Sequence, residues 1–597
     1  MRPTEIGNPD YFHKVVDCQW ACPAHTPVPE YIRLIAAGRY SDAYMVNWYS
    51  NVFPGILGRT CDRPCEPACR RVRVEDEPVA ICRLKRVAAD NKDDVSARMP
   101  TAPSARNGKR VALIGAGPAS LTVARDLAPL GYDVVIYDSE PRGGGMIRSQ
   151  IPRFRLPESV IDEEVGYIVG MGGIETRYGT RIDSLASVVA ESHDAIFVGT
   201  GAPRGRDLDV PGRTEAAANI HIGIDWLSSV SFGHIEKIGK RVIVLGGGNT
   251  AMDCCRTSRR LGGEDVKVIV RSGFEEMKAS PWEKEDAMHE GIPILNYLVP
   301  KEFTHKNGKL TGVMFEKVAA VRDDKGRRRL EPTGEPDVHV ECDDVLVAIG
   351  QENAFPWIER DIGLEFDKWG MPVVDAVTHQ STLPNVFFGG DSAFGPKNII
   401  WAVAHGHAAA ISIDKFCKSQ DVHERPPPFV TLISQKMGIH EWSYDSEISL
   451  DRRKKVPLQD QKIALANIKA EVELGFDRLV GYEETQRCLN CDVETVFSET
   501  LCIECDACVD ICPMDCITFT ANGPEADLRQ RLSAPAVNLS QDLYISATLK
   551  TGRIMAKDED VCLHCGLCAE RCPTGAWDMQ KFLLDMTHAA GRSGCYS

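Results

Sequence analysis

Two runs of four cysteines near the C-terminal end of the chain have the spacing that holds iron–sulfur clusters. Each run is C-x2-C-x2-C-x3-C followed by proline. Three thiolates of one run bind one [4Fe–4S] cluster, and the fourth cysteine reaches the cluster of the other run. The expected ligand sets are Cys502, Cys505, Cys508 and Cys572 for one cluster and Cys562, Cys565, Cys568 and Cys512 for the other. Two zinc sites are the alternative, but zinc motifs usually pair two-cysteine knuckles.

This double run resembles bacterial ferredoxins, which implies an α+β ferredoxin domain. Cys516 occupies a position where ferredoxins usually carry a small apolar residue, and we expect it to pack rather than to bind metal. The segment 514–561 between the runs is longer than the usual spacer. We therefore expect it to form a surface excursion.

The bulk composition describes a multidomain protein of a reducing compartment. The chain has 597 residues, a formal net charge of −16 and 22 cysteines, six between positions 18 and 82 and eleven between 488 and 572. The start lacks the basic and apolar regions of a secretory signal, no apolar run approaches the length of a membrane span, and nucleic-acid binding needs basic patches. These properties predict a cytoplasmic protein that binds no nucleic acid and whose cysteines hold metal rather than disulfides.

A strand–turn–helix–strand pattern in the middle of the chain predicts a dinucleotide-binding unit. The apolar run 111–114 enters the turn Gly115-Ala116-Gly117, a helix follows, and the strand 134–137 ends at Asp138. Glycines let the backbone approach a pyrophosphate at the helix N-terminus, where free N–H groups favour anions. Asp138 is in position to bind a ribose hydroxyl, and Ser120 is small enough to replace the third glycine of the motif.

A second unit of the same kind begins about 130 residues later. The strand 242–245 leads into Gly246-Gly247-Gly248, a helix begins near Asn249, and the next strand, 266–270, ends at Arg271. An acid at this point binds the ribose 2′-hydroxyl of NAD, whereas arginine favours the 2′-phosphate of NADP, and Lys278 can assist. The sequence therefore favours NADPH over NADH.

Further stretches make the middle of the chain resemble a known family. They are GGGMIRSQIPRFRLP, GGGNTAMDCCRTSRRLG, VAIGQ and GGDSAFGPKNIIWAVAHGHAAA. These stretches resemble flavin reductases related to the glutamate synthase small subunit, the FAD/NADPH half of dihydropyrimidine dehydrogenase and ferredoxin:NADP transhydrogenase large subunits. The resemblance implies FAD contacts from Gly115, Gly117, Ser120, Asp138, Gly145, Gly201, Gly390 and Asp391. It implies nicotinamide nucleotide contacts from Gly246, Gly248, Asn249, Thr250, Arg271 and Lys278.

The resemblance extends to the N-terminus, with one departure. Reductases of this group carry a helical domain with two [4Fe–4S] clusters, and its cysteines begin with a leading CxxC pair. The cysteines available here are Cys18, Cys22, Cys61, Cys65, Cys69 and Cys82, and none precedes Cys18. Six cysteines cannot fill two four-thiolate sites.

The leading pair of the family reads RCLxC, and this string occurs here at 487–491. We hypothesise that Cys488 and Cys491 complete one N-terminal cluster with Cys18 and Cys69, within one chain or across a dimer. Cys22, Cys61, Cys65 and Cys82 would hold the other. One N-terminal cluster with spare thiols, or a zinc site at Cys488 and Cys491, are the alternatives.

The resulting architecture is multidomain α/β, with the NADPH domain inserted into the FAD domain. The expected parts are a helical iron–sulfur domain (1–100), a first FAD part (101–240), the NAD(P)H domain (241–344), a second FAD part (345–420), a linker (421–487) and the ferredoxin-like domain (488–597).

A flavin converts hydride chemistry into single-electron transfer to clusters, and this predicts an electron-transfer reductase subunit. Its expected cofactors are FAD, NADPH or NADH and four [4Fe–4S] clusters. Its expected partner is a ferredoxin or a catalytic redox subunit of a larger complex. No catalytic side chain is named, because hydride transfer to flavin needs no obligatory acid or base, and His405 and His407 are expected to pack near the flavin. The alternative is a non-enzymatic electron wire with a vestigial nucleotide site.

Overall fold

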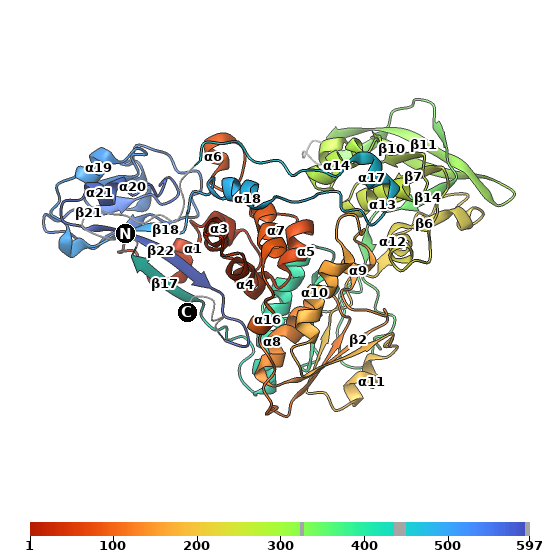
Figure 1. The fold of residues 1–597 in the computed structure, drawn as a ribbon, viewed down its shortest axis with the longest axis horizontal. Coiled ribbons are helices and arrows are strands. Elements are labelled where there is room, and N and C mark those ends of the chain that lie inside the picture. Colours follow the sequence, from red (N-terminus) through yellow and green to blue (C-terminus); the bar gives the residue numbers. More distant parts are fainter. Residues whose placement is uncertain (323–327, 435–448, 592–597) are drawn as a thin grey trace. The chain divides into compact units, whose positions relative to one another are not determined.

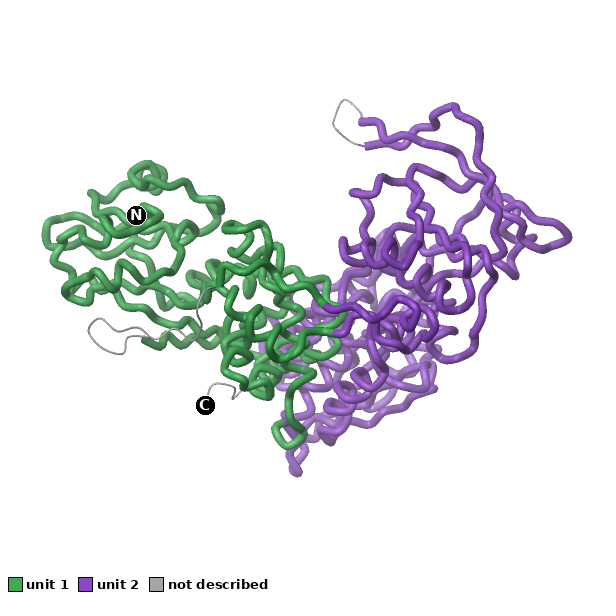
Figure 2. The backbone as a smooth tube through the Cα atoms, turned by 45° about the horizontal axis from the view of Figure 1, so that its top comes forward, with its two compact units in different colours: residues 1–98, 424–456, 475–597 green, residues 99–423, 457–474 purple. Residues whose placement is uncertain are grey.

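The computed structural model describes residues 1–322, 328–434 and 449–591, which fall into two compact units. Unit 1 comprises Met1–Arg98, Glu424–Val456 and Gly475–Ser597, and unit 2 comprises Met99–His423 and Pro457–Leu474 (Figure 2). Both units are therefore built from segments that are distant in the sequence. Among the described residues, no helix is long and apolar enough to cross a membrane.

The first sheet of unit 2, whose strand β2 is labelled in Figure 1, is parallel throughout, with strand order β16-β4-β1-β2-β3. Its strands are β1 (Arg110–Ile114), β2 (Asp133–Asp138), β3 (Ile174–Tyr178), β4 (Ala195–Val198) and β16 (Val386–Phe388). Parallel strands buried on both faces are continuously apolar, which explains runs such as Val111–Ile114. Helix α8 (Pro118–Leu127) follows β1 and packs along α16 (Ile399–Cys417). The helices approach closely at Gly406, where a Cβ would lie 2.6 Å from Thr122 Cβ.

The second sheet of unit 2 is also parallel, with strand order β6-β14-β7-β8-β9. The strands are β6 (Ile220–Ile222), β14 (Asp344–Val347), β7 (Arg241–Leu245), β8 (Asp265–Ile269) and β9 (Ile294–Leu295). Helices α12 (Gly223–Ser231), α13 (Asn249–Arg260) and α14 (Pro281–His289) accompany this sheet. The expected boundaries at 240 and 345 differ from this arrangement, because β6 and β14 both lie in the second sheet. A strand's own sequence does not say which of two parallel sheets it joins.

An antiparallel sheet follows β9 in the chain. It contains β10 (Leu298–Lys306), β11 (Lys309–Arg322), β12 (Arg328–Pro332) and β13 (Val338–Glu341), with β11 in the centre. Phe303, Val313 and Phe315 face a core shared with Ile243 and Ile269 of the second parallel sheet. The hairpin sheet is therefore part of the nucleotide domain.

The N-terminal part of unit 1 is helical. Its helices are α1 (Pro9–His13), α2 (Asp17–Trp20), α3 (Val28–Ala36), α4 (Tyr40–Asn51), α5 (Pro54–Thr60), α6 (Val72–Glu75) and α7 (Ile81–Asn91). Helix α18 (Arg478–Thr485) packs against α3 and α7. One hydrophobic core contains Phe12 and Tyr31 together with Trp577 and Phe582. Both ends of the chain thus form a single core.

The C-terminal part of unit 1 is α+β and has two antiparallel sheets. One has the order β17 (Phe429–Ser434), β22 (Trp577–Asp585), β18 (Val493–Phe497), and the other β19 (Ile517–Thr520), β21 (Ile554–Lys557), β20 (Tyr544–Ile545). The short helices are α19 (Ala507–Ile511), α20 (Glu525–Arg529) and α21 (Leu567–Arg571).

Two segments are more ordered than their sequences suggest. The expected linker supplies β17, α17 (Gln461–Ala466) and α18. The expected surface excursion buries Leu528, Leu532 and Leu543 against Ile554. Both segments are rich in polar residues, and only tertiary packing shows that their few apolar side chains are buried.

Buried ion pairs fix both ends of the loop that contains Cys488 and Cys491. On the N-terminal side, the fully buried Arg487 donates to Glu484 Oε1 at 2.9 Å and to the carbonyl oxygens of Glu77 and Pro78. On the C-terminal side, Asp492 Oδ1 accepts from Arg33 of α3 at 2.7 Å. The loop is therefore held against the N-terminal helices by charges that water does not screen.

We expect Arg487→Met to destabilise the protein by about 3–5 kcal/mol, because Glu484, which is also fully buried, would lose the cation that compensates its charge. Chemical denaturation followed by far-UV circular dichroism would measure the loss. The matched control is Arg478→Met at the start of the preceding helix α18, where the exposed side chain bonds Asn91 and lies over the Tyr40 ring, and it should matter by less than about 1 kcal/mol. Equal effects of the two substitutions would contradict this account.

Candidate functional site: cysteine groups and dinucleotide turns

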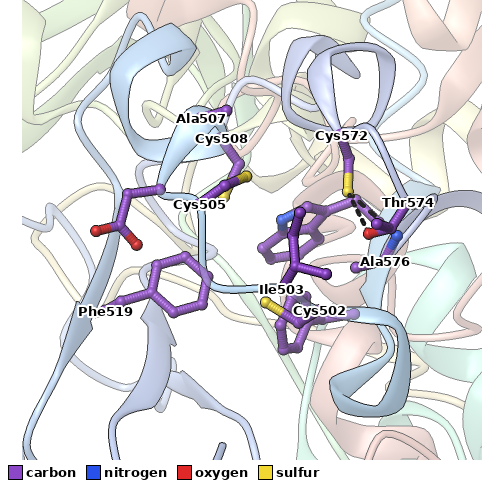
Figure 3. A pocket seen from close by; sticks show the side chains of 12 residues that line it. Cys502, Ile503, Cys505, Ala507, Cys508, Phe519, Cys572, Thr574 and Ala576 are labelled. Atoms are coloured by element: carbon purple, nitrogen blue, oxygen red, sulfur yellow. Dashed lines mark hydrogen bonds between the residues drawn. The ribbon is translucent and has the colours of Figure 1, made fainter. Parts of the chain in front are cut away.

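The first C-terminal cysteine group surrounds a pocket. Cys502, Cys505 and Cys508 line it together with Cys572 of the second run, so the crossed ligand set expected from the sequence lies around one space. Figure 3 shows the labelled cysteine side chains directed toward this space, with Phe519 at its rim. Cys572 Sγ accepts the backbone N–H of Ala576 at 3.2 Å, a bond that favours the thiolate.

The second C-terminal group surrounds a similar pocket. Its lining includes Cys562, Cys565, Cys568 and, from the first run, Cys512. Cys516 lines the same pocket, and its sulfur lies 3.5 Å from Cys512 Sγ. Cys516 therefore packs directly beside an expected ligand.

A third pocket brings together cysteines from both ends of the chain. Cys18 and Cys69 line it with Cys488 and Cys491, which are more than 400 residues away in the sequence. Burial, and then the neighbouring thiols of Cys69, Cys491 and Cys488, raise the pKa of Cys18. The four residues of the hypothesised shared cluster are therefore neighbours.

The loop at Cys488 has the backbone of the two ferredoxin loops. In the first C-x-x-C segment of each of these loops, the residue two after the first cysteine has a left-handed φ: +56° at Glu504, +55° at His564 and +49° at Asn490. The N–H groups of Glu504 and His564 point back to the preceding sulfur, at 3.4 Å from Cys502 Sγ and 3.3 Å from Cys562 Sγ. Asn490 makes the corresponding backbone bond to Cys488. Non-glycine residues adopt this conformation rarely, so its recurrence indicates a common task.

A fourth group lies around a buried lysine in the N-terminal helices. Burial lowers the pKa of Lys85, but the thiols of Cys61, Cys82 and Cys22, followed by Cys65, outweigh it and leave the pKa raised. All four cysteines of the remaining expected set therefore lie near enough to one ammonium group to raise its pKa.

The separation of the sulfur atoms distinguishes clusters from zinc. Four thiolates on one zinc ion lie about 3.8 Å apart, because the Zn–S bond is about 2.3 Å and the geometry tetrahedral. The groups of close metal-binding side chains found among the described residues are Asp126 with His407 and His588, and Glu559 with Cys562 and His564. Neither is a set of four cysteines, and the expectation of cubane clusters rests on the spacing of the cysteine runs.

Buried cations beside the cysteines were not anticipated from the sequence. Lys557, which is fully buried, lies near Cys562, Cys516 and Cys568, and Arg70 lies near Cys491. Arg70 Nη1 also donates to the carbonyl oxygen of Cys562 at 3.3 Å. Arg70 therefore connects the third cysteine pocket, which contains Cys491, to the loop that carries Cys562 in the second cysteine pocket. Of the buried cations, Lys85 could have been predicted from the sequence, because its spacing from Cys82 puts both residues on one face of α7.

The first dinucleotide turn has the geometry that a pyrophosphate needs. Gly115 has φ +97°, and a Cβ there would lie 2.6 Å from the Gly199 carbonyl oxygen. A Cβ on Gly145 would lie 2.8 Å from Gly117 Cα, so these two backbones also approach closely. Ser120 is fully buried beneath Gly199, as expected for a small residue at the helix–strand contact.

Two half-buried carboxylates flank this turn. Asp138 Oδ2 accepts the N–H of Ala116 at 2.5 Å, and Asp391 Oδ1 accepts that of Lys397 at 2.9 Å. Burial raises the pKa of both carboxyl groups. Gly201 and Gly390 have left-handed φ values of +68° and +64°, as their turns require. Both carboxylates keep lone pairs that could accept hydroxyl groups of a bound flavin nucleotide.

The two histidines of α16 have different surroundings. Burial lowers the pKa of His405 to about 4, and its ring packs against Phe394 and Trp401. His407 Nδ1 lies 2.6 Å from Asp126 Oδ2. His405 is therefore neutral near pH 7 and belongs to an aromatic cluster close to Asp391.

The second dinucleotide turn is equally tight. Gly246 has φ +139°, and a Cβ there would lie 2.2 Å from the Ala348 carbonyl oxygen. Gly248 is the N-cap of α13, whose first turn contains Asn249 and Thr250, and Asn249 Oδ1 accepts the N–H of Ser280 at 2.8 Å. Arg271 and Lys278 are exposed on the loop after β8. The expected residues are thus together at the carboxyl edge of the sheet, where dinucleotides bind.

Three segments of the chain match known protein families. Residues 109–406 match the family described as pyridine nucleotide-disulphide oxidoreductase. Residues 13–97 match dihydropyrimidine dehydrogenase domain II, 4Fe-4S cluster, and residues 501–576 match the 4Fe-4S dicluster domain.

Characterised relatives align over most of the chain. The NADPH-Fe(3+) oxidoreductase subunit beta of Geobacter sulfurreducens is 32% identical over 82% of this chain and 77% of its own length. The NADP(+)-dependent formate dehydrogenase subunit beta of Moorella thermoacetica is 34% identical over 79% and 70%. The glutamate synthase [NADPH] small chain of Azospirillum brasilense is 33% identical over 68% and 86%.

Replacing Cys488 and Cys491 by serine should lower the iron content by about four atoms per chain, the content of one [4Fe–4S] cluster. Anaerobic purification with iron and sulfide analysis would measure it. The matched control is Cys417→Ser on α16, which belongs to no cysteine group and should leave iron unchanged. Unchanged iron in the double variant would exclude the shared cluster.

Proposed function

Since this chain belongs to the family of flavin-dependent pyridine nucleotide oxidoreductases that includes the glutamate synthase small chain, we propose that it moves electrons between NADPH and a partner redox protein. The partner is a ferredoxin or the catalytic subunit of a larger complex. The observation that carries the proposal is the combination, in one chain, of two tight dinucleotide turns with four groups of four neighbouring cysteines. The bound flavin and clusters supply the conversion between a hydride and single electrons.

The proposed ligand sets use sixteen cysteines for four clusters. Two sets are the crossed C-terminal ones, the third is Cys18, Cys69, Cys488 and Cys491, and the fourth is Cys22, Cys61, Cys65 and Cys82. Lys85, Arg70 and Lys557 each stand next to a different set, and their charge stabilises the thiolates in an otherwise apolar surrounding. Cys516 is not a ligand in any of the four proposed sets.

In unit 2, the first turn and Asp138 hold the flavin nucleotide, and Asp391 accepts hydroxyl groups of its ribityl chain. The second turn holds the pyrophosphate of the nicotinamide nucleotide at the free N–H groups of α13. Arg271 and Lys278 contact the 2′-phosphate, and NADPH is the preferred nucleotide. No side chain is assigned as an acid or base.

The proposal is tested by NADPH-dependent reduction of a viologen dye by the purified chain, with FAD and iron content verified beforehand. Activity with NADPH supports an oxidoreductase. Full cofactor loading without any activity would instead support the alternative of a non-enzymatic electron wire. Copurification of the native complex would identify the partner.

Gly246→Val should abolish NADPH-dependent dye reduction, because the side chain collides with the Ala348 carbonyl and disfavours φ +139°. Reduction of the clusters by dithionite should be unchanged, since the four cysteine groups lie in unit 1. Visible absorption under anaerobic conditions would follow both reactions. Full retention of the NADPH reaction would contradict the assignment of this turn.

A further inference from the structure

The loop after β8 contains as many acids as bases. It includes Arg271 and Lys278, but between them lie Glu275 and Glu276, and all four side chains are exposed. Two cations and two carboxylates cancel, so the loop by itself has no net charge with which to attract a 2′-phosphate. An acid in this region is also the group that binds the 2′-hydroxyl of NAD. The loop alone therefore does not explain a preference for NADPH.

The Glu276 carboxylate is held in a fixed position. Its Oε2 accepts the N–H of Gly273 at 2.7 Å and closes the loop on itself. The Tyr297 hydroxyl lies so close to Gly273 that a Cβ there would be 2.6 Å from it, and Asn296 Nδ2 donates to the Ser272 carbonyl at 2.9 Å. The loop is thus pinned to the chain that leads into β10.

A cation from outside the loop pairs with this carboxylate. Arg328, at the start of β12, places Nη2 2.6 Å from Glu276 Oε2. The two side chains are 32% and 38% exposed. Water therefore screens the pair only in part, and within the part of the chain that the structure describes the remaining guanidinium N–H groups have no second acceptor and could face an anion.

We propose that Arg328 is a specificity-determining residue for the nicotinamide nucleotide, and that it selects the 2′-phosphate by neutralising Glu276. This inference rests on the proposed function, in which the loop after β8 receives the adenosine ribose. With Arg328 included, the charges at the loop sum to one positive. Without it, an unpaired carboxylate faces the phosphate and is available to a 2′-hydroxyl instead.

The hairpin of β11 and β12 therefore has a role in recognition. Its backbone register places Arg328 opposite Arg322, and the next residue, Arg329, points to the other face of the strand. Arg329 is exposed and is the neighbouring residue on the same strand, so it provides a control of the same residue type and charge.

The test uses the cofactor-loaded chain and two readouts. Arg328→Ala should raise the KM for NADPH about tenfold with kcat little changed, because the unpaired Glu276 carboxylate then repels the 2′-phosphate, and the KM for NADH should not rise. Calorimetric titration should show a similar loss of affinity for 2′,5′-ADP and none for 5′-AMP. Both effects should shrink at high salt, since the pair is partly exposed. Arg329→Ala should leave all five quantities unchanged.

A second substitution distinguishes neutralisation from a structural role of the hairpin. Glu276→Gln keeps the acceptor for the Gly273 N–H but removes the charge, and in the Arg328→Ala background it should restore most of the affinity for 2′,5′-ADP. Failure to restore it, or equal losses for 2′,5′-ADP and 5′-AMP, would overturn the role of Arg328. If the unaltered chain prefers NADH, the NADPH assignment fails and the role of Arg328 fails with it. If the unaltered chain prefers NADPH over NADH and the Arg328→Ala variant has the same preference, only the role of Arg328 fails.

Discussion

The structure of unit 1 depends on the burial of Arg487 between segments that are remote in the sequence. Its fully buried guanidinium meets the carboxylate of Glu484 and the carbonyl oxygens of the 77–78 segment, and an unpaired charge there would be very costly. The next residue is Cys488. These contacts hold the loop of Cys488 and Cys491 against the N-terminal helices. The third cysteine pocket follows from that constraint.

The same electrostatic rule operates at the other cysteine groups. Thiolates buried among apolar side chains need nearby positive charge or N–H donors, and the chain supplies both. Lys85 stands among one set and Lys557 beside another, while left-handed turns aim backbone N–H groups at Cys502 and Cys562. Arg70 bonds the carbonyl of Cys562 while standing next to Cys491, so two neighbouring groups share one cation.

In unit 2 the main constraint is a different one, the close approach of the backbone to a charged ligand. Gly115 and Gly246 occupy equivalent places in two parallel sheets, and in each case a neighbouring carbonyl leaves no room for a side chain. The second sheet carries an additional antiparallel hairpin, which brings Arg328 to the loop after β8. A surface addition thus adjusts the charge of a site whose scaffold is common to many dinucleotide-binding proteins.

The features that depend on local spacing could be predicted from the sequence. Each C-terminal cysteine run, and each glycine turn with the acid or base after its second strand, is encoded within about thirty residues, so a local pattern suffices to predict it. Which distant parts of the chain meet is visible only in the fold. The sequence suggested a partner for the Cys488 pair, but only the packing of α18 on α3 and α7 brings the pair to Cys18 and Cys69. Likewise β6 and β14 join the second sheet, and Arg328 reaches Glu276, because these contacts link residues whose proximity depends on the whole fold rather than on any repeat or spacing in the chain.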